Sequence, residues 1–370
     1  MKTEKDWIAG LIKSLESFKK GPIKGKIFIG CDGYVDQIRR AVKTRTTSGT
    51  VEYFETITGF SDRLAAAAGK SGQVELITDN VKLGGNAPIM ANALGHLGVE
   101  NYCLGNSGFP SLHPSYKEMH PKVNLLPVGN PGESIALEFN DGKIILSELT
   151  VFRDLNWDQV KKTADIKKIN KGMNDCEILA LVGWCNPDHA TDVWKGILKE
   201  VMPQSPAKKL IFFDLADPSK KSKEDLLEVL SVMNSFQKFG KAILGLNENE
   251  TLKLYHIISD TLPGEDHSDL KTKSKAIFDF MKIEGLLVHP VDRSIYVDRS
   301  GIREISGRVV KDPIISTGGG DNLNAGFCLG YLLGASVEES MILGMATSGS
   351  YVKNGKSPDI KAIIEYLNSW

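Results

Sequence analysis

Short apolar runs that are typical of buried strands alternate with helical patterns over roughly 300 residues of this chain. Strands are predicted at 26–30, 101–105, 177–183, 209–214, 242–246, 286–288 and 294–297. Helices are predicted around 188–201, 222–239, 337–352 and 359–368. Such alternation places helices on both faces of a sheet, so it predicts an α/β fold with a central, mainly parallel sheet.

Two pairs of apolar runs interrupt this alternation and are typical of β-hairpins. The first pair covers residues 42–58 and turns near Ser48-Gly49, whereas the second joins 134–139 to 143–146 through Asp141-Gly142. An Asp-Gly pair between strand-like runs is a strong hairpin signal, because both residues accept the backbone angles of a tight turn. These hairpins predict a small β lid over the ligand crevice.

The whole chain, residues 1–370, is predicted to form a single domain, because no linker-like segment divides it. The lid segments are expected near residues 37–58 and 133–153. Residues 4–20 carry an apolar stripe at helical spacing, which predicts an extra helix at the N-terminus.

Charge and composition exclude several classes of partner. The chain has 45 Lys and Arg residues against 46 Asp and Glu residues, so its net charge gives no case for binding nucleic acid or an acidic membrane. Its start is charged and unlike a signal peptide, and no apolar run approaches the roughly 20 residues of a membrane span. Five scattered cysteines are most simply reduced thiols. A cytoplasmic location is therefore expected.

A glycine-rich stretch from Ser316 to Phe327 opens one of the helical patterns. Gly318, Gly319 and Gly320 let the backbone turn its N–H groups toward one point, where the helix N-terminus also favours an anion. Asp321 can then accept a proton from a hydroxyl while the amides stabilise a transferring phosphoryl group. The common phosphate loops G-x-x-x-x-G-K-[ST] and G-x-G-x-x-G do not match this stretch. Taken alone, it is more typical of a tight loop with an acidic helix cap.

A second glycine turn, Gly84-Gly85, opens a helix of small residues. The glycines let a ligand approach the backbone, and Asn86 offers both a donor and an acceptor to a hydroxyl. Asp36 ends the turn, residues 31–36, that is predicted to leave the strand 26–30. Carboxylates past the end of a parallel strand face the ligand crevice, so Asp36 can bind a polyol. A structural turn aspartate explains Asp36 equally well.

A third polar segment, Asn247-Glu248-Asn249-Glu250, follows the strand 242–246 directly. Acidic side chains just past a strand end can hold a hydrated Mg²⁺ ion. The signal is weak by itself, because a solvated helix start has the same composition.

The two glycine motifs, about 230 residues apart, together resemble the ribokinase-like (PfkB) carbohydrate kinase family, from about residue 26 to the C-terminus. The family's first motif is matched by Gly84, Gly85, Ala87, Ala91, Leu97 and Gly98. Its second motif is matched by Gly318, Gly320, Asp321, Ala325 and Gly326, with Gly319 in place of an alanine. Asn247 and Glu250 fit the family's N-x-x-E motif, and Asp36 stands where the family keeps a sugar-binding aspartate. Four matches in the same order favour a kinase site over unrelated turns.

The resemblance implies an ATP-dependent kinase that phosphorylates a hydroxyl of a sugar or sugar-like substrate. Asp321 would be the base, and Gly318, Gly319 and Gly320 would form the anion hole. Substrate-binding residues would be Asp36, Gly84, Gly85 and Asn86, and nucleotide-binding residues would be Asn247, Glu250 and Thr317.

The resemblance also implies cofactors and partners. Glu250 would hold Mg²⁺ through water, and the family leaves room for a monovalent cation. Members often form homodimers through the lid. Their acceptors include hexoses, pentoses, nucleosides and sugar phosphates. Because no Arg/Lys cluster marks a second phosphate site, we expect an unphosphorylated acceptor here.

The sequence departs from the family pattern in ways that affect substrate and nucleotide binding. Ile89 replaces the family's substrate-binding asparagine, and Ile315-Ser316 replaces its Asp-Thr pair. Leu323 replaces a phenylalanine, and residues 288–291 lack the family's glycine turn. The N-terminal helix and residues 59–80 are expected to be insertions.

Three alternatives remain open from the sequence. A catalytically weak sensor of sugars or nucleosides would explain Ile89 and Ile315, whereas the intact Asp321 argues against it. A nucleoside kinase and a kinase that uses ADP as donor would share the fold and the base.

Overall fold

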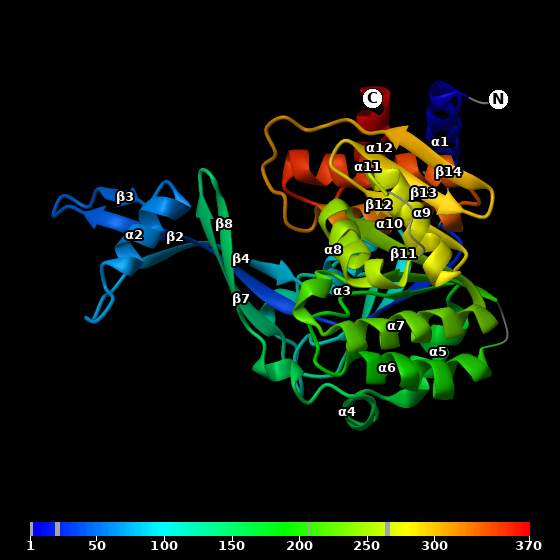
Figure 1. Cartoon of the computed structure of the whole chain (residues 1–370), viewed down its shortest axis with the longest axis horizontal. Helices are drawn as coiled ribbons and strands as arrows, with labels where there is room; N and C mark the ends of the chain where they lie inside the picture. Colours follow the sequence, from blue (N-terminus) through cyan, green and yellow to red (C-terminus); the bar gives the residue numbers. More distant parts are fainter. Residues whose placement is uncertain (1–2, 19–22, 206–207, 263–266) are drawn as a thin grey trace.

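The computed structural model describes residues 3–18, 23–205, 208–262 and 267–370 of the protein (Figure 1). Its larger sheet has nine strands in the order β14-β13-β12-β11-β10-β9-β1-β5-β6. The parallel strands are β1 (Lys26–Gly30), β5 (Glu100–Gly105), β6 (Val123–Pro127), β9 (Ile178–Leu181), β10 (Lys209–Asp214), β11 (Gly240–Asn247) and β12 (Gly285–His289). Strands β13 (Arg293–Asp298) and β14 (Gly301–Ser306) are antiparallel additions at one edge. The predicted α/β fold is confirmed.

Helices cover both faces of this sheet. One face carries α4 (Trp157–Thr163), α5 (Ile166–Asp175), α6 (Ala190–Gly196), α7 (Lys223–Ser235), α8 (Glu248–Ile258) and α9 (Leu270–Met281). The other face carries α1 (Glu4–Phe18), α3 (Asn86–His96), α10 (Gly319–Leu332), α11 (Val337–Asn354) and α12 (Ile360–Asn368). Each layer packs its own hydrophobic core against the sheet.

Strand β1 illustrates why the sequence signal of this sheet is strong. Ile27 and Ile29 belong to the core beneath α3 and α10, and Phe28 belongs to the core on the opposite face. All three side chains are fully buried. A strand that is covered on both faces reads as a continuous apolar run instead of an alternating one.

A smaller sheet extends away from the body of the molecule as a lid (Figure 1). Its strands follow the order β3-β2-β7-β8, and β4 pairs with β2. The bounds are β2 (Tyr34–Arg45), β3 (Val51–Tyr53), β4 (Leu76–Gly84), β7 (Gly132–Phe139) and β8 (Gly142–Glu148). Both predicted hairpins are present, since β2 pairs antiparallel with β3 and β7 pairs antiparallel with β8.

One detail of the lid differs from the sequence-based expectations. Asp36 lies within β2, and only three residues separate β2 from β1, so the expectation that residues 31–36 form a turn was wrong beyond Gly33. The aspartates and Gly33 suggest a turn locally, but pairing of β2 with β4 and β7 imposes an extended chain. Residues 59–80, expected as an insertion, supply most of α2 (Ile57–Ala65) and part of β4 to the lid.

Helix α1 closes the core at the end of the molecule where both chain termini lie (Figure 1). Leu11 and Leu15 are buried in the core shared with α11 and α12. The Trp370 indole N–H also donates to Glu4 Oε1 at 2.8 Å. The predicted helix is confirmed as far as Phe18, and its expected last residues, 19 and 20, lie outside the described residues.

Two further expectations can be compared with the described part of the chain. No helix there is long and apolar enough to cross a membrane. All five cysteines are free and buried, as expected for reduced thiols.

We expect Leu15→Ala to lower the free energy of unfolding by about 2–5 kcal/mol, because it leaves a cavity under a fully buried side chain. The matched variant Glu16→Ala changes an exposed residue of the same helix and is expected to stay within about 0.5 kcal/mol of the wild type. Urea unfolding measures both. Equal stability of Leu15→Ala and the wild type would show that α1 is not an integral part of the fold.

Candidate active site

The carboxyl ends of the parallel strands and the base of the lid enclose a cavity of about 380 Å³. Of the residues proposed for the site, Asp36, Gly85, Asn86, Asn247, Glu250, Thr317, Gly318, Gly320 and Asp321 all line it. A second cavity of about 310 Å³ adjoins it and is lined by Gly319 and by apolar side chains such as Leu323, Met345 and Val352. Volumes of this size are typical of small-ligand sites.

The glycine stretch forms the start of helix α10. Gly318 has a φ of 92°, and a Cβ at this position would lie 2.9 Å from the Tyr351 hydroxyl oxygen, so both conformation and space require glycine. The helix begins at Gly319, earlier than the apolar pattern suggests. The amides of Gly320 and Asp321 therefore belong to a first helical turn, which lacks intrahelical acceptors. This end of α10 is suited to an anion.

Asp321 lies in that first turn and is only 8% exposed. Its Oδ1 accepts a hydrogen bond from Asn86 Nδ2 at 2.9 Å. Burial, reinforced by the nearby Asp214, raises the pKa of Asp321 well above its ordinary value. A carboxylate with a raised pKa is a stronger base once it has lost its proton.

The start of helix α3 is held from a distance by Asp32. Gly85, the residue before this helix, has a φ of 93° and no side chain to cap it. Asp32 accepts hydrogen bonds from the amides of Asn86 (3.1 Å) and Ala87 (2.8 Å), and from Asn186 Nδ2 (3.2 Å). Burial nevertheless raises the pKa of Asp32 to about 6. Asp32 thus orients the helix start that carries Asn86.

The lid contributes Asp36 to the same cavity. The carboxylate packs against Gly84, where a Cβ would lie 2.5 Å from its atoms, and it accepts a hydrogen bond from Ser134 Oγ. Lys143, on lid strand β8, donates to Ser316 Oγ at 3.2 Å and also to Thr317 Oγ1. The lid is therefore in polar contact with the loop that precedes the glycines.

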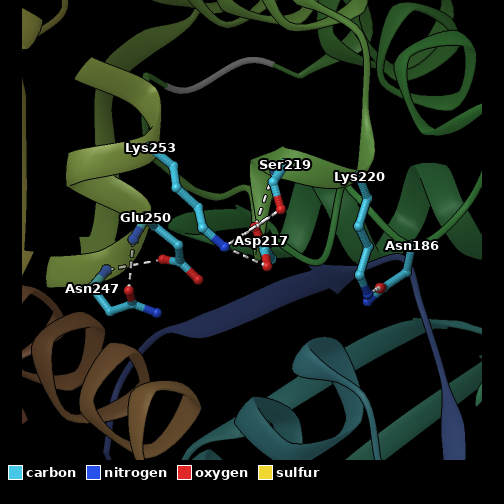
Figure 2. Close-up of polar contacts among 7 residues, drawn as sticks. All are labelled: Asn186, Asp217, Ser219, Lys220, Asn247, Glu250 and Lys253. Atoms are coloured by element: carbon cyan, nitrogen blue, oxygen red, sulfur yellow. Dashed lines mark hydrogen bonds and ion pairs between the residues drawn. The ribbon is translucent and has the colours of Figure 1, made fainter. Parts of the chain in front are cut away.

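Asn247 and Glu250 form a capping box at the start of α8, with both reciprocal hydrogen bonds at 2.9 Å (Figure 2). Glu250 is 8% exposed, and burial, followed by the nearby Asp214, raises its pKa to about 8. Lys253 points toward Asp217 instead, with Nζ 2.8 Å from the carboxylate (Figure 2). Among the described residues, neither Glu250 nor the nearby Asp214 forms an ion pair with a lysine or arginine.

These carboxylates are ligands of the kind that a Mg²⁺ ion takes in proteins. Among the described residues, no group of three or more His, Cys, Asp or Glu side chains could hold a metal alone. Mg²⁺ typically binds one or two protein carboxylates and otherwise waters and substrate phosphates. Glu250, with Asp214 close by, meets that requirement.

Sequence reasoning missed several residues of the site. Asp32, Asn186, Asp214, Lys220 and His289 line the cavity or hold residues that do, but no role was predicted for them. Asp214 ends a predicted strand, so the rule that found Asp36 could also have found it. Lys220 lies beside Asn186, with Nζ 3.3 Å from its side-chain oxygen (Figure 2), and no sequence signal places the two together.

We expect the pH dependence of stability to identify Asp32 as a buried acid. Because folding raises its pKa to about 6, the folded state keeps a proton that the unfolded state has lost, and this advantage disappears as the pH rises. The free energy of unfolding of the wild type, relative to Asp32→Asn, should fall by about 3 kcal/mol between pH 3 and pH 7.

Urea unfolding at a series of pH values measures this difference. Asp62→Asn, which changes an exposed carboxylate of the lid, is the matched control and should follow the wild type. Parallel pH profiles for the wild type and Asp32→Asn would contradict the assignment.

Comparisons with known proteins agree with this geometry. A model of the prokaryotic ketohexokinase family matches residues 9–370. The ketohexokinase of Haloferax volcanii is 26% identical over 337 residues, which cover 90% of this chain and 88% of that protein.

Solved structures show the same fold at low sequence identity. A probable sugar kinase from Rhizobium etli CFN 42 has a TM-score of 0.67 at 15% identity, covering 94% of this chain and 99% of that one. A ribokinase from Thermotoga maritima has a TM-score of 0.63 at 15% identity, covering 93% and 99%. Because the family match spans nearly the whole chain, the protein belongs to the prokaryotic ketohexokinase family and is an ATP-dependent sugar kinase of the ribokinase-like (PfkB) group.

Proposed function

We propose that the protein transfers the γ-phosphoryl group of ATP to a hydroxyl of a ketohexose. The observation that carries the proposal is the position of Asp321, a buried carboxylate in the first turn of α10 that shares one cavity with Asp36. The ketohexose is supported by the family description and by the ketohexokinase from Haloferax volcanii.

An unphosphorylated acceptor is supported by the charges around the cavity. Of the described residues that line it, Lys220 alone is cationic, whereas Asp36, Asp214, Glu250 and Asp321 are acidic. A sugar phosphate would bring further negative charge among these carboxylates, and like charges in a partly buried site repel strongly. A neutral polyol instead meets hydrogen-bond acceptors.

The transfer step can be assigned to residues of this chain. Asp321 accepts the proton of the attacking hydroxyl, whose oxygen forms a bond to the γ-phosphorus while the bond to ADP breaks. The amides of Gly320 and Asp321, in the first turn of α10, face the anionic phosphoryl oxygens. Asn86 keeps the Asp321 carboxylate oriented through the 2.9 Å hydrogen bond. The products are a sugar phosphate, ADP and a protonated Asp321.

The remaining residues position the two substrates. Asp36, beside Gly84 and Gly85, accepts hydrogen bonds from the sugar hydroxyls, and Asn247 and Thr317 face the nucleotide. Glu250 would hold Mg²⁺ through water, and the ion would offset the charge of the ATP phosphates. Lys143 keeps the lid against the loop at Ser316 and Thr317, which helps to exclude water from the site.

We expect an ATP-consumption assay to give turnover on ketohexoses and much weaker turnover on aldoses, sugar phosphates and nucleosides. Asp321→Asn should keep the fold and lower kcat by about 10²–10⁴-fold, because the amide cannot accept the proton. Asp312→Asn changes an exposed carboxylate nearby and serves as the matched control. Parallel assays with K⁺ and with Na⁺ test for a monovalent cation.

Each part of the proposal has its own contrary result. Preferred turnover of a nucleoside or a sugar phosphate would overturn the acceptor, and preference for ADP would overturn the donor. A near-normal kcat in Asp321→Asn would show that Asp321 is not the base. Ligand-induced thermal stabilisation without turnover of any acceptor would favour the sensor alternative.

We also propose a homodimer formed through the lid. Strand β8 is the last strand of the small sheet, and its Ile145 and Leu146 are 49% and 55% exposed. An apolar strand at a sheet edge invites pairing with another chain. The lid extends away from the body and so leaves this edge accessible (Figure 1).

We expect light scattering to give a dimer for the wild type and a monomer for Leu146→Glu, because the substitution places a charge in the proposed contact. Leu252→Glu introduces the same charge at a 43% exposed position on α8 and should stay dimeric. A monomeric wild type would refute the dimer.

A further inference from the structure

His289 occupies the place where the two cavities meet. It is the last residue of β12, and its register partner on the neighbouring strand is Asn247. Four residues line both cavities: Asn247, His289, Ser316 and Gly320. A Cβ on Gly320 would lie 3.5 Å from His289 Cε1, so the imidazole ring lies close to the start of α10.

The ring has an unmet hydrogen-bonding group. His289 Nε2 is buried and has no hydrogen-bond partner in the described part of the chain. Buried polar side-chain atoms usually have a partner, so an unpaired one in a cavity wall indicates a missing ligand or water. Burial also lowers the pKa of His289 to about 4, so the ring is neutral at pH 7 in the free protein.

The residues that line the two cavities indicate which part of a bound ATP molecule would lie beside His289. Asp321 lines the first cavity, so an ATP molecule that reacts there must place its γ-phosphoryl group in it. The second cavity, with Leu323, Met345 and Val352, offers the apolar walls that suit a base. The phosphate chain, which joins the two ends of ATP, has to cross the junction at His289.

We propose that His289 is a nucleotide-binding residue whose Nε2 forms a hydrogen bond with the phosphate chain of ATP where it crosses between the cavities. A neutral imidazole that carries its hydrogen on Nε2 donates to a phosphate oxygen, and an imidazolium does so as well. The proposal rests on the proposed function for the position of the γ-phosphoryl group, but it does not depend on which sugar is the acceptor.

The test compares nucleotides with and without phosphates. Calorimetric titration of ATP, ADP and adenosine, with Mg²⁺ and without sugar, is carried out on the wild type and on His289→Leu, His289→Ala and His289→Gln. We expect His289→Leu and His289→Ala to bind ATP and ADP about 10–100-fold more weakly, the usual effect of losing a hydrogen bond to a charged group. Adenosine affinity should change less than about threefold.

His289→Gln gives the sharpest comparison, because its side-chain amide N–H can reach the region that Nε2 occupies. It should recover most of the ATP affinity that His289→Leu loses. His256→Leu changes an exposed histidine on α8 and is the matched control. Thermal unfolding of each variant identifies any that fails to fold, and the two remaining substitutions then decide the result.

Two outcomes would overturn the proposal. An equal loss of adenosine and ATP affinity would mean that His289 only shapes the second cavity. Unchanged ATP affinity in His289→Ala and His289→Leu would mean that the phosphate chain does not contact the ring. Failure of the wild type to phosphorylate ketohexoses would leave these binding results unaffected, so the two proposals fail separately.

Discussion

Four carboxylates are buried around one cavity. The strand ends and helix starts that surround them supply the groups that stabilise their negative charge. Asp32 and Asp214 are 0% and 5% exposed, and Glu250 and Asp321 are each 8% exposed. Removing a charge from water is costly unless hydrogen bonds replace the solvent. Backbone amides and the side chains of Asn86, Asn186 and Asn324 provide these bonds. Three helices, α3, α8 and α10, also start at this cavity, and their positive ends favour negative charge.

The hydrogen bonds lower the energy of the carboxylates only in part, because burial still raises the pKa of each one. The ion pair between Lys253 and Asp217 has side chains that are 32% and 39% exposed, so it contributes little to offset these charges. A site with surplus buried acidity is suited to a ligand that arrives with cations. Under the proposed function, magnesium-bound ATP would be such a ligand, and its binding would relieve the electrostatic cost of these buried carboxylates.

The lid belongs to this arrangement because its first strand is a continuation of β1 after a short turn. Tyr34–Arg45 begins beside the cavity and ends far from it, so Asp36 is fixed by the same strand that carries the outer lid. The turn itself contains Asp32, which holds the start of α3. A movement of the lid about this turn would therefore act on Asp36 and, through Lys143, on the glycine loop.

The parts of the candidate site that could be predicted from the sequence are those where the residue type itself restricts the backbone. Gly85 and Gly318 have positive φ, and a Cβ on Gly84 would lie 2.5 Å from the Asp36 carboxylate. The resemblance to one family linked the two glycine motifs from sequence alone. Asp36 lines the cavity, but its local structure was predicted wrongly, because glycine and aspartate suggest a turn that pairing with β4 and β7 overrides. Asp32 and His289 could not be predicted, since a buried acid and an unpaired ring nitrogen are defined only by distant neighbours.

The structure explains why helix α3 carries Ile89 where the family pattern has an asparagine. Ile89 stands where the resemblance leads one to expect a sugar-binding asparagine, and it packs 3.3 Å from the Cβ position of Gly318. Asn86, one turn earlier, uses its amide for Asp321. The polar side chain of Asn86 therefore orients the Asp321 carboxylate, and a methyl group of Ile89 lies beside the glycine loop. Under the proposed function, sugar recognition in this cavity would then fall to Asp36 and the neighbouring lid residues.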